Sequence, residues 1–333
     1  MSKNSDRTAE VLEATLAPII ASIEEGIANP GDWTAPWHRS TGNAWSPMCP
    51  ATGKHYTASN RFMLGVAAVF FGAEPHWGTF AQWKGMSKHS TACNKTATGV
   101  GKRGEKRPDC SDDCQIVSVR KGEKSITQAL RPLMRKETDD SGVESTRLFG
   151  FAPFAVFHSG QVEGYDIPAA DVTDGLDADG IAAAFEWMAS TGAEIRQSTT
   201  AGASYSPSSD SITMPEASRW TDVAGAWSTG AHELCHWTGH SSRLDRDLSG
   251  RFGDDSYAAE ELVAELGAAF ALAKLGRSAE PRADHAQYLA HWLRVLQSDP
   301  KHLMTVASHA EKASEFVLDA ATATADTEPL VAA

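Results

Sequence analysis

No apolar run in the 333-residue chain approaches the ~18–20 residues needed to cross a bilayer. The first ten residues are polar, and so they lack the apolar stretch of a secretion signal. The five cysteines are an odd number in a long chain, which makes a poor disulfide framework. These absences predict a cytoplasmic protein with no membrane contact, whose cysteines are free thiols or metal ligands.

Basic residues are scarce in the second half of the chain. Residues 1–165 carry 19 Lys and Arg against 17 Asp and Glu, a balance of +2, whereas the remainder carries 11 against 26, a balance of −15. Within the first half, residues 81–136 hold 13 basic and 5 acidic side chains, a local balance of +8. The asymmetry favours a first domain that tolerates a polyanion; the alternative is a cationic face that is merely solvated.

The length and a change of composition after Gly164 predict two domains. In the first domain, residues 1–165, an amphipathic helix over 12–27 is kinked at Pro18, and a buried strand covers 149–157. Residues 87–114 form a polar insertion, and residues 135–146 form a flexible loop. The second domain covers residues 166–322 and precedes a disordered tail at 323–333. Its expected elements are a hairpin at 205–215 and helices at about 223–238, 257–275, 283–297 and 301–320.

The five residues His232-Glu233-Leu234-Cys235-His236 have the spacing of a metal site. Residues four apart lie on one helical face, about 5–6 Å between β-carbons, so both imidazoles can reach one tetrahedral Zn²⁺. Glu233 then lies beside the open coordination position, where it can take a proton from water and deliver it to a leaving amine. The pattern predicts a zinc-dependent peptidase; the alternative is a solvated polar patch on a helix.

A third ligand is expected from the next helix, which carries Glu260, Glu261 and Glu265. A carboxylate about 25 residues past the second histidine completes a set of two histidines and one glutamate. We assign Glu261 as the ligand and Glu265 as the hydrogen-bond partner of a ligand histidine, with Glu260 as the alternative ligand. His240 is a competing candidate one turn further on, but the longer motif that uses a third histidine has Ser242 in its place.

Motifs that cover most of the chain resemble one known family. They include the segments 205–215, 232–243 and 257–270, and, more loosely, Trp33-x-x-Pro36-Trp37 and residues 120–124. In these the chain resembles the ArdC-type antirestriction proteins of plasmids and phages. The resemblance implies an α+β fold, with an N-terminal α+β single-stranded-DNA-binding domain shared with TraC-type plasmid primases. A mainly helical zincin-like metallopeptidase domain with a small sheet is expected to follow.

The same resemblance implies an antirestriction factor that protects incoming DNA and cleaves an unidentified protein, for which a host restriction or defence factor is the hypothesis. It also implies that the substrate strand pairs with the edge of the small sheet. The hairpin at 205–215 is the candidate for that edge, and a purely structural hairpin is the alternative.

The polar insertion carries a second set of metal-binding side chains. A segment this polar cannot form a hydrophobic core, and a structural zinc would supply its folding energy. The alternative is a disordered insertion with incidental thiols. The candidate ligands are His89, Cys93, Cys110 and Cys114.

Single-strand binding requires cations for phosphates and aromatic faces for bases. The turn at 120–124 places three cations around a glycine, where they are costly to bury and easy to present to a phosphate. A different class of function stays open, a non-catalytic protein that shields single-stranded DNA and carries only a structural zinc. The candidate DNA-binding residues are Lys54, Tyr56, Arg61, Arg120, Lys121 and Lys124.

Overall fold

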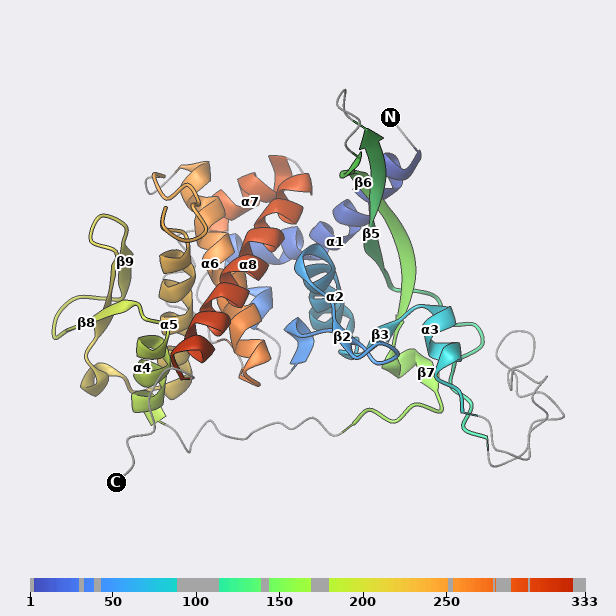
Figure 1. Cartoon of the computed structure of the whole chain (residues 1–333), viewed down its shortest axis with the longest axis horizontal. Helices are drawn as coiled ribbons and strands as arrows, with labels where there is room; N and C mark the ends of the chain where they lie inside the picture. Colours follow the sequence, from blue (N-terminus) through green and yellow to red (C-terminus); the bar gives the residue numbers. More distant parts are fainter. Residues whose placement is uncertain are drawn as a thin grey trace. The chain divides into compact units, whose positions relative to one another are not determined.

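The computed structural model of this protein describes residues 3–29, 33–38, 43–88, 114–138, 144–168, 180–250, 254–277, 279, 289–298 and 300–325 (Figure 1). The chain forms two compact units, and each combines helices with small sheets, as the predicted α+β class requires. The first unit consists of Met1–Ala17 and Ser46–Ala170, and the second of Pro18–Trp45 and Asp171–Ala333.

The first unit is built around helix α2 and a long hairpin. Strands β5 and β6 pair antiparallel from Thr127↔Val156 to Thr138↔Glu144, with a register shift between Leu133 and Met134. Strand β3 extends this sheet through Trp77↔His158. The elements are the start of α1 (Lys3–Ala28), β1 (Met48–Cys49), β2 (Lys54–His55), α2 (Ala58–Phe71), β3 (Trp77–Gly78), α3 (Phe80–Gly85), β4 (Ser118–Val119), β5 (Thr127–Thr138), β6 (Glu144–His158), η4 (Ser159–Gln161) and β7 (Val162–Glu163).

Apolar side chains from α2 and the sheet close this unit. Leu64 and Ala67 of α2 pack with Trp77, Ala129 and Val156, all nearly or fully buried. Helix α2 ends at Phe71 because Gly72 adopts a left-handed backbone with φ 64° and donates its amide to the carbonyl of Ala67.

The second unit is mainly helical and carries one three-stranded sheet. The strand order is β8-β10-β9, so β10 is central and β9 is an edge strand antiparallel to it. Its elements are the end of α1, η1 (Pro36–His38), η2 (Asn43–Trp45), α4 (Gly180–Ser190), β8 (Glu194–Ser198), β9 (Ser204–Ser206), β10 (Ser211–Pro215), η5 (Ala217–Arg219), α5 (Val223–Thr238), α6 (Asp255–Lys274), α7 (Leu289–Ser298) and α8 (Pro300–Ala325).

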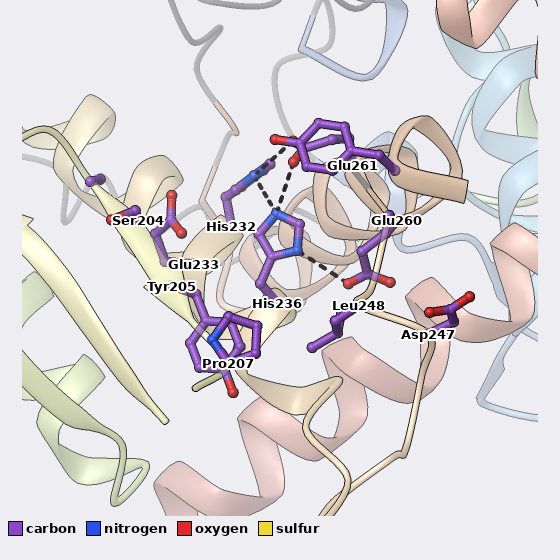
Figure 2. A pocket seen from close by; sticks show the side chains of 13 residues that line it. Ser204, Tyr205, Pro207, His232, Glu233, His236, Asp247, Leu248, Glu260 and Glu261 are labelled. Carbon is purple, nitrogen blue, oxygen red and sulfur yellow. Dashed lines mark hydrogen bonds and ion pairs between the residues drawn. The ribbon is translucent and has the colours of Figure 1, made fainter. Parts of the chain in front are cut away.

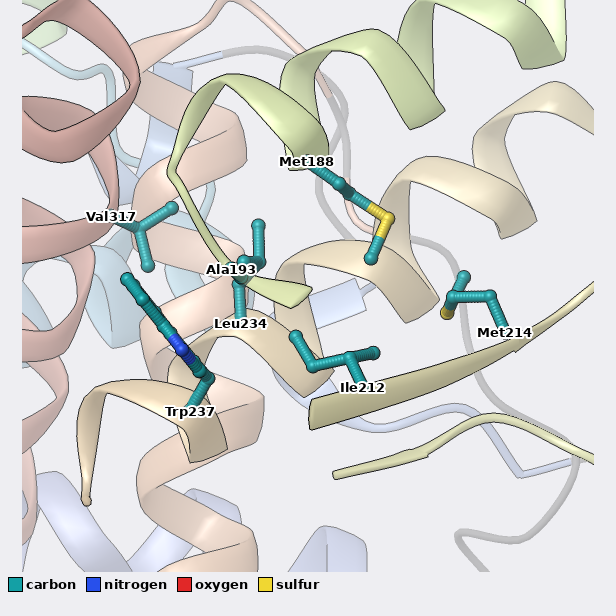
Figure 3. Close-up of a cluster of buried hydrophobic side chains, with 7 residues drawn as sticks. All are labelled: Met188, Ala193, Ile212, Met214, Leu234, Trp237 and Val317. Atoms are coloured by element: carbon teal, nitrogen blue, oxygen red, sulfur yellow. The ribbon is translucent and has the colours of Figure 1, made fainter. Parts of the chain in front are cut away.

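One face of α5 is buried against the sheet and α8 (Figure 3). Leu234 and Trp237 of α5 pack with Ile212 and Met214 of β10 and with Val317 of α8. Fully burying a side chain such as Leu234 contributes roughly 1.5–3 kcal/mol. This packing fixes the rotation of α5 about its axis, so that the polar side chains of the helix lie outside this apolar contact.

Residues 18–45 belong to the second unit, whereas the sequence prediction placed them in the first domain. Aromatic packing explains the difference: Trp37 meets Trp292 edge-on at 5.3 Å between ring centroids, and Trp45 lies 6.0 Å from Phe270. Helix α1 continues through Pro18 without restarting there.

Two further expectations about local structure are wrong in part. At the loop expected over 135–146, β5 extends to Thr138 and β6 starts at Glu144, and residues 139–143 lie outside the described residues. Helix α8 continues to Ala325 and so overlaps the predicted tail, whose remaining residues 326–333 lie outside the described residues. Among the residues that the structure describes, no helix is both long and apolar enough to span a membrane.

Candidate metal centre

Helix α5 carries three of the predicted site residues on its polar face. The helix begins after Asp222, whose carboxylate accepts hydrogen bonds from the amides of Ala224 (3.1 Å) and Gly225 (2.7 Å). Such a cap is worth about 1 kcal/mol. His232 and Glu233 are each 3% exposed, so the packing of α5 holds them inside the protein.

A close approach of α6 brings the acidic residues to this face. Gly267 of α6 lies against Cys235 of α5, and a β-carbon at this glycine would lie 2.8 Å from the sulfur. Cys235 is fully buried with Ala264 and Ala313, and burial raises the pKa of its thiol to about 12. Small residues at this crossing let the two helices lie close enough for glutamates to reach the histidines.

His232, His236 and Glu261 converge on one point (Figure 2). The Nε2 atoms of the two histidines are 3.0 Å apart, and each lies 3.5 Å from an oxygen of Glu261. One ligand atom from each residue lies within 4.8 Å of the others. Two imidazole nitrogens and one carboxylate fit a tetrahedral divalent metal whose fourth position is open.

The charges at this point also fit a cation. Burial opposes a charge on His236, but the hydrogen bonds and negative charges of Glu260 and Glu261 outweigh it and raise the pKa of His236 to about 10. Burial likewise opposes the charge on Glu261, yet its contacts with the two histidines hold its pKa well below the ordinary range. The carboxylates around the two histidines therefore favour positive charge at this point, which a bound cation would supply.

A second carboxylate lies next to Nδ1 of each histidine: Glu260 is hydrogen-bonded to His236, and Glu265 lies within ion-pair distance of His232. Glu265 Oε1 lies 3.1 Å from Nδ1 of His232, and Glu260 Oε1 lies 3.1 Å from Nδ1 of His236. Arg246 in turn binds both oxygens of Glu260, at 2.9 and 2.8 Å. Carboxylates in this position fix the tautomer and the orientation of a metal-binding imidazole.

Glu233 lines a cavity of about 270 Å³ together with the two histidines and Glu261. Ser204 and Tyr205 of the edge strand β9 line the same cavity. In Figure 2, Glu233 lies on the side of the imidazoles that faces Ser204 and Tyr205, away from Glu260. The carboxylate, the convergence point and a sheet edge therefore share one space.

A polar network that the sequence did not indicate supports the cavity wall. The hydroxyl of Tyr205 donates to Asp210 over 2.9 Å, and Arg243 forms an ion pair with the same carboxylate. Burial, followed by this hydrogen bond, raises the pKa of Tyr205. Arg243 also lies over the ring of Trp237 at 4.1 Å. Neither Asp210 nor Arg243 lies at a helical spacing from the two histidines, so the sequence pattern does not indicate that they belong to the same site.

His240, the competing ligand candidate, lies outside the convergent group. Its Nδ1 is 2.9 Å from Ser242 Oγ and 3.9 Å from Asp210. Of the candidates for a second zinc, His89, Cys93 and Cys110 lie outside the described residues, and Cys114 is buried.

The candidate DNA-binding residues do not share one environment. Lys54, Arg120, Lys121 and Lys124 are exposed. Arg61 is fully buried, so its assignment as a phosphate contact is wrong: it lies in α2, where the neighbouring side chains from Phe62 to Ala67 are buried as well.

Two of these residues are partly engaged within the protein. The ring of Tyr56 packs against the core around Leu64, and its hydroxyl donates to the carbonyl of Trp77 over 3.4 Å. The guanidinium of Arg120 binds Glu123 at 2.8 Å and also the carbonyl of Gly160. Of the candidates, Lys54, Lys121 and Lys124 are lysines whose side chains are exposed.

Comparison with known proteins gives a consistent picture of both halves. Residues 9–157 match the family described as the N-terminal domain of the anti-restriction factor ArdC, and residues 182–309 match the family described as zincin-like metallopeptidase. A protein of Sinorhizobium fredii (strain NBRC 101917 / NGR234), named uncharacterized protein y4eC, is 32% identical over 94% of this chain and 94% of its own length. The DNA primase TraC of Escherichia coli is 33% identical over 89% of this chain, which spans only 19% of the primase.

The fold is also similar to that of a solved protein. The metal-free crystal structure of the antirestriction ArdC protein from plasmid R388 gives a TM-score of 0.67 at 30% identity, over 94% of this chain and 98% of that one. A Mn(II)-bound structure of the same plasmid protein gives a TM-score of 0.63 at 29% identity, over 93% and 98%.

Proposed function

This chain belongs to the ArdC-type antirestriction family, and from that premise we propose that its second unit is a zinc-dependent peptidase and its first unit binds single-stranded DNA. The zincin-like fold and the metal-bound relative support a divalent metal at the histidines. We propose zinc as that metal, because two imidazoles and one carboxylate in an open tetrahedral set are typical of catalytic zinc.

The observation that carries the proposal is the convergence of His232, His236 and Glu261 in a cavity that Glu233 also lines. A zinc ion held there would polarise a peptide carbonyl and lower the pKa of water. Glu233 would accept the proton of the attacking water and later return it to the leaving amine. For these two proton transfers, one carboxylate that shares a cavity with the open coordination position is sufficient.

Strand β9 supports a binding mode for the substrate. Its paired neighbour β10 occupies the centre of the sheet, which leaves the other side of β9 at the edge. An extended peptide could pair with this edge through backbone hydrogen bonds, with its carbonyl directed towards the cavity. Of the hairpin predicted at 205–215, it is therefore the β9 side that we assign to the substrate.

The first unit supports DNA binding through its exposed cations. Lys121 and Lys124 lie in a turn next to β4, and Lys54 lies in β2. Cations on exposed turns can contact phosphates without a desolvation penalty, and such contacts do not depend on base sequence. We propose that this unit coats incoming single-stranded DNA while the second unit cleaves a protein of the restriction or defence system of the host.

The test compares the parent with Glu233→Gln, incubated with host extract in the presence and absence of single-stranded DNA. We expect the variant to retain one zinc and the thermal stability of the parent, but to lose cleavage of the protein that disappears with the parent. Glu194→Gln, an exposed substitution in the same unit, is the matched control. Equal cleavage by Glu233→Gln would show that this carboxylate is not the base.

A third outcome distinguishes the alternative function. If no protein disappears with the parent, while both parent and Glu233→Gln protect single-stranded DNA equally, the protein acts as a shield and the metal has a structural role.

A further inference from the structure

Glu265 connects the metal centre to a distant part of the chain. Its Oε1 atom lies 3.1 Å from Nδ1 of His232. Its Oε2 atom lies 3.0 Å from Nε2 of His38 and accepts a hydrogen bond from Nε1 of Trp37 over 3.3 Å. Glu265 is 3% exposed, so these groups, rather than solvent, set the position of the carboxylate.

Trp37 and His38 are held firmly where they meet Glu265. They end the short helix η1, and Trp37 is 2% exposed with its ring packed edge-on against Trp292 of α7. The side chain of His38 is 3% exposed. All of these residues belong to the second unit, so the connection lies within one compact body.

The two histidines of the metal centre are thus supported in parallel ways. Behind His236, Glu260 is held by Arg246, which also binds the carbonyl of Cys235 at 2.7 Å. Behind His232, Glu265 is held by Trp37 and His38. In each case a buried carboxylate receives hydrogen bonds from its supporting residues and lies 3.1 Å from Nδ1 of a histidine. When that imidazole is neutral, a proton held on Nδ1 leaves Nε2 for the metal.

We propose that Trp37 and His38 are positioning residues of the metal centre, which act through Glu265 to fix the tautomer and orientation of His232. The proposal rests on the metal site of the proposed function, but it does not require proteolysis. It also means that the metal centre includes a segment from within the residues that match the ArdC N-terminal family, far from the zincin-like match.

The experiment measures Zn²⁺ affinity of the full chain by competition with a chromophoric chelator. His38→Ala removes a donor to Glu265 and is expected to weaken Zn²⁺ binding by up to about tenfold, because the ~10–100-fold effect applies to losing the direct partner of a ligand histidine. His38→Gln retains an N–H donor and should recover most of the affinity, and Trp37→Phe should weaken binding less than His38→Ala. His55→Ala, at an exposed histidine of β2 in the first unit, is the matched control and should bind as the parent does.

A spectroscopic measurement separates positioning from a merely structural role. With Co²⁺ in place of Zn²⁺, the visible absorption bands should shift in His38→Ala and return towards the parent in His38→Gln, because ligand orientation changes the ligand field. Parent-like Zn²⁺ affinity and Co²⁺ spectra in His38→Ala would overturn the proposal, even if the variant unfolds at a lower temperature. Loss of proteolysis is not part of this test, so failure of the peptidase assignment would leave these results interpretable; a parent that binds neither metal would overturn both.

Discussion

The two units place their functional side chains in opposite ways. In the second unit, His232, Glu261 and Glu265 are buried and converge on one another. In the first unit, Lys121 and Lys124 are exposed on a turn. A buried cluster depends on every member, because removing one leaves other charges without a partner. Exposed cations contribute separate, small increments, so the two units should respond very differently to single substitutions.

The largest effect is expected from removing a histidine of the convergent group. His236→Ala should lower Zn²⁺ affinity by more than the ~100-fold that the loss of an outer partner causes, because the metal loses a direct ligand. Chelator competition measures this, and His240→Ala serves as the control because that side chain lies outside the group. If His236→Ala still binds one Zn²⁺ as tightly as the parent, the metal is held elsewhere.

The next test compares the cores of the two units. Leu234 and Leu64 are both fully buried, so Leu234→Ala and Leu64→Ala should each lower the free energy of unfolding by about 2–5 kcal/mol. Only Leu234→Ala should also weaken Zn²⁺ binding, because Leu234 lies between the two histidines in sequence and anchors α5 to the sheet. Urea unfolding of the metal-free protein and Zn²⁺ titration of the folded variants measure the two effects. Equal Zn²⁺ affinity in both variants would show that the site does not depend on how α5 packs.

The pH dependence of metal binding follows from the charge on His236. The folded, metal-free protein has a pKa of about 10 at this residue, raised from 6.5, so its imidazole is protonated at neutral pH. Zn²⁺ requires the neutral imidazole and must displace this proton. Affinity should therefore rise with pH up to about 10, by about tenfold per pH unit for one released proton.

Calorimetric titrations in buffers of different ionisation enthalpy count the released protons. Glu260→Gln removes one of the two carboxylates that raise the pKa of His236, and it should reduce proton release at pH 8. Metal binding without proton release in the parent would contradict the raised pKa. The raised pKa of His236 also affects the stability of the metal-free protein. Its charged imidazole stabilises the fold fully below pH 6.5, and this contribution is lost as the pH rises through about 10.

How well the sequence predicts a region depends on how far apart in the sequence its interacting residues lie. Helix α5 has the predicted bounds 223–238, because its apolar and polar positions repeat within a single helix. The approach of Glu261 and Glu265 to the histidines could be anticipated because both lie on one face of the following helix. The contact of His38 with Glu265 spans 227 residues in sequence, and no periodic pattern connects the two.

Exposed structure was predicted least well. The end of the β5–β6 hairpin was expected to be a loop because residues 135–146 are charged and polar. Backbone pairing nevertheless continues there through pairs such as Lys136↔Thr146. Side chains at this end, including Met134 and Leu148, are exposed on their strands, so no buried face produces the alternation by which a strand is recognised. Arg61 shows the opposite error, since a cation within an apolar helix was assigned to the surface.

The smallest effect is expected from the cations of the first unit. Lys121→Ala and Lys124→Ala should each weaken single-stranded DNA binding modestly and lower the slope of log affinity against log salt by about 0.7 per lost phosphate contact. Fluorescence anisotropy with a labelled oligonucleotide at several salt concentrations measures both quantities, with Lys274→Ala as the control because that lysine lies in the second unit and is paired with Glu311. Because these contacts are separate, the double variant should show the sum of the two changes. An unchanged salt slope in the double variant would place the DNA on a different face of the first unit, whereas a loss far greater than the sum would show that these exposed cations cooperate as the buried residues do.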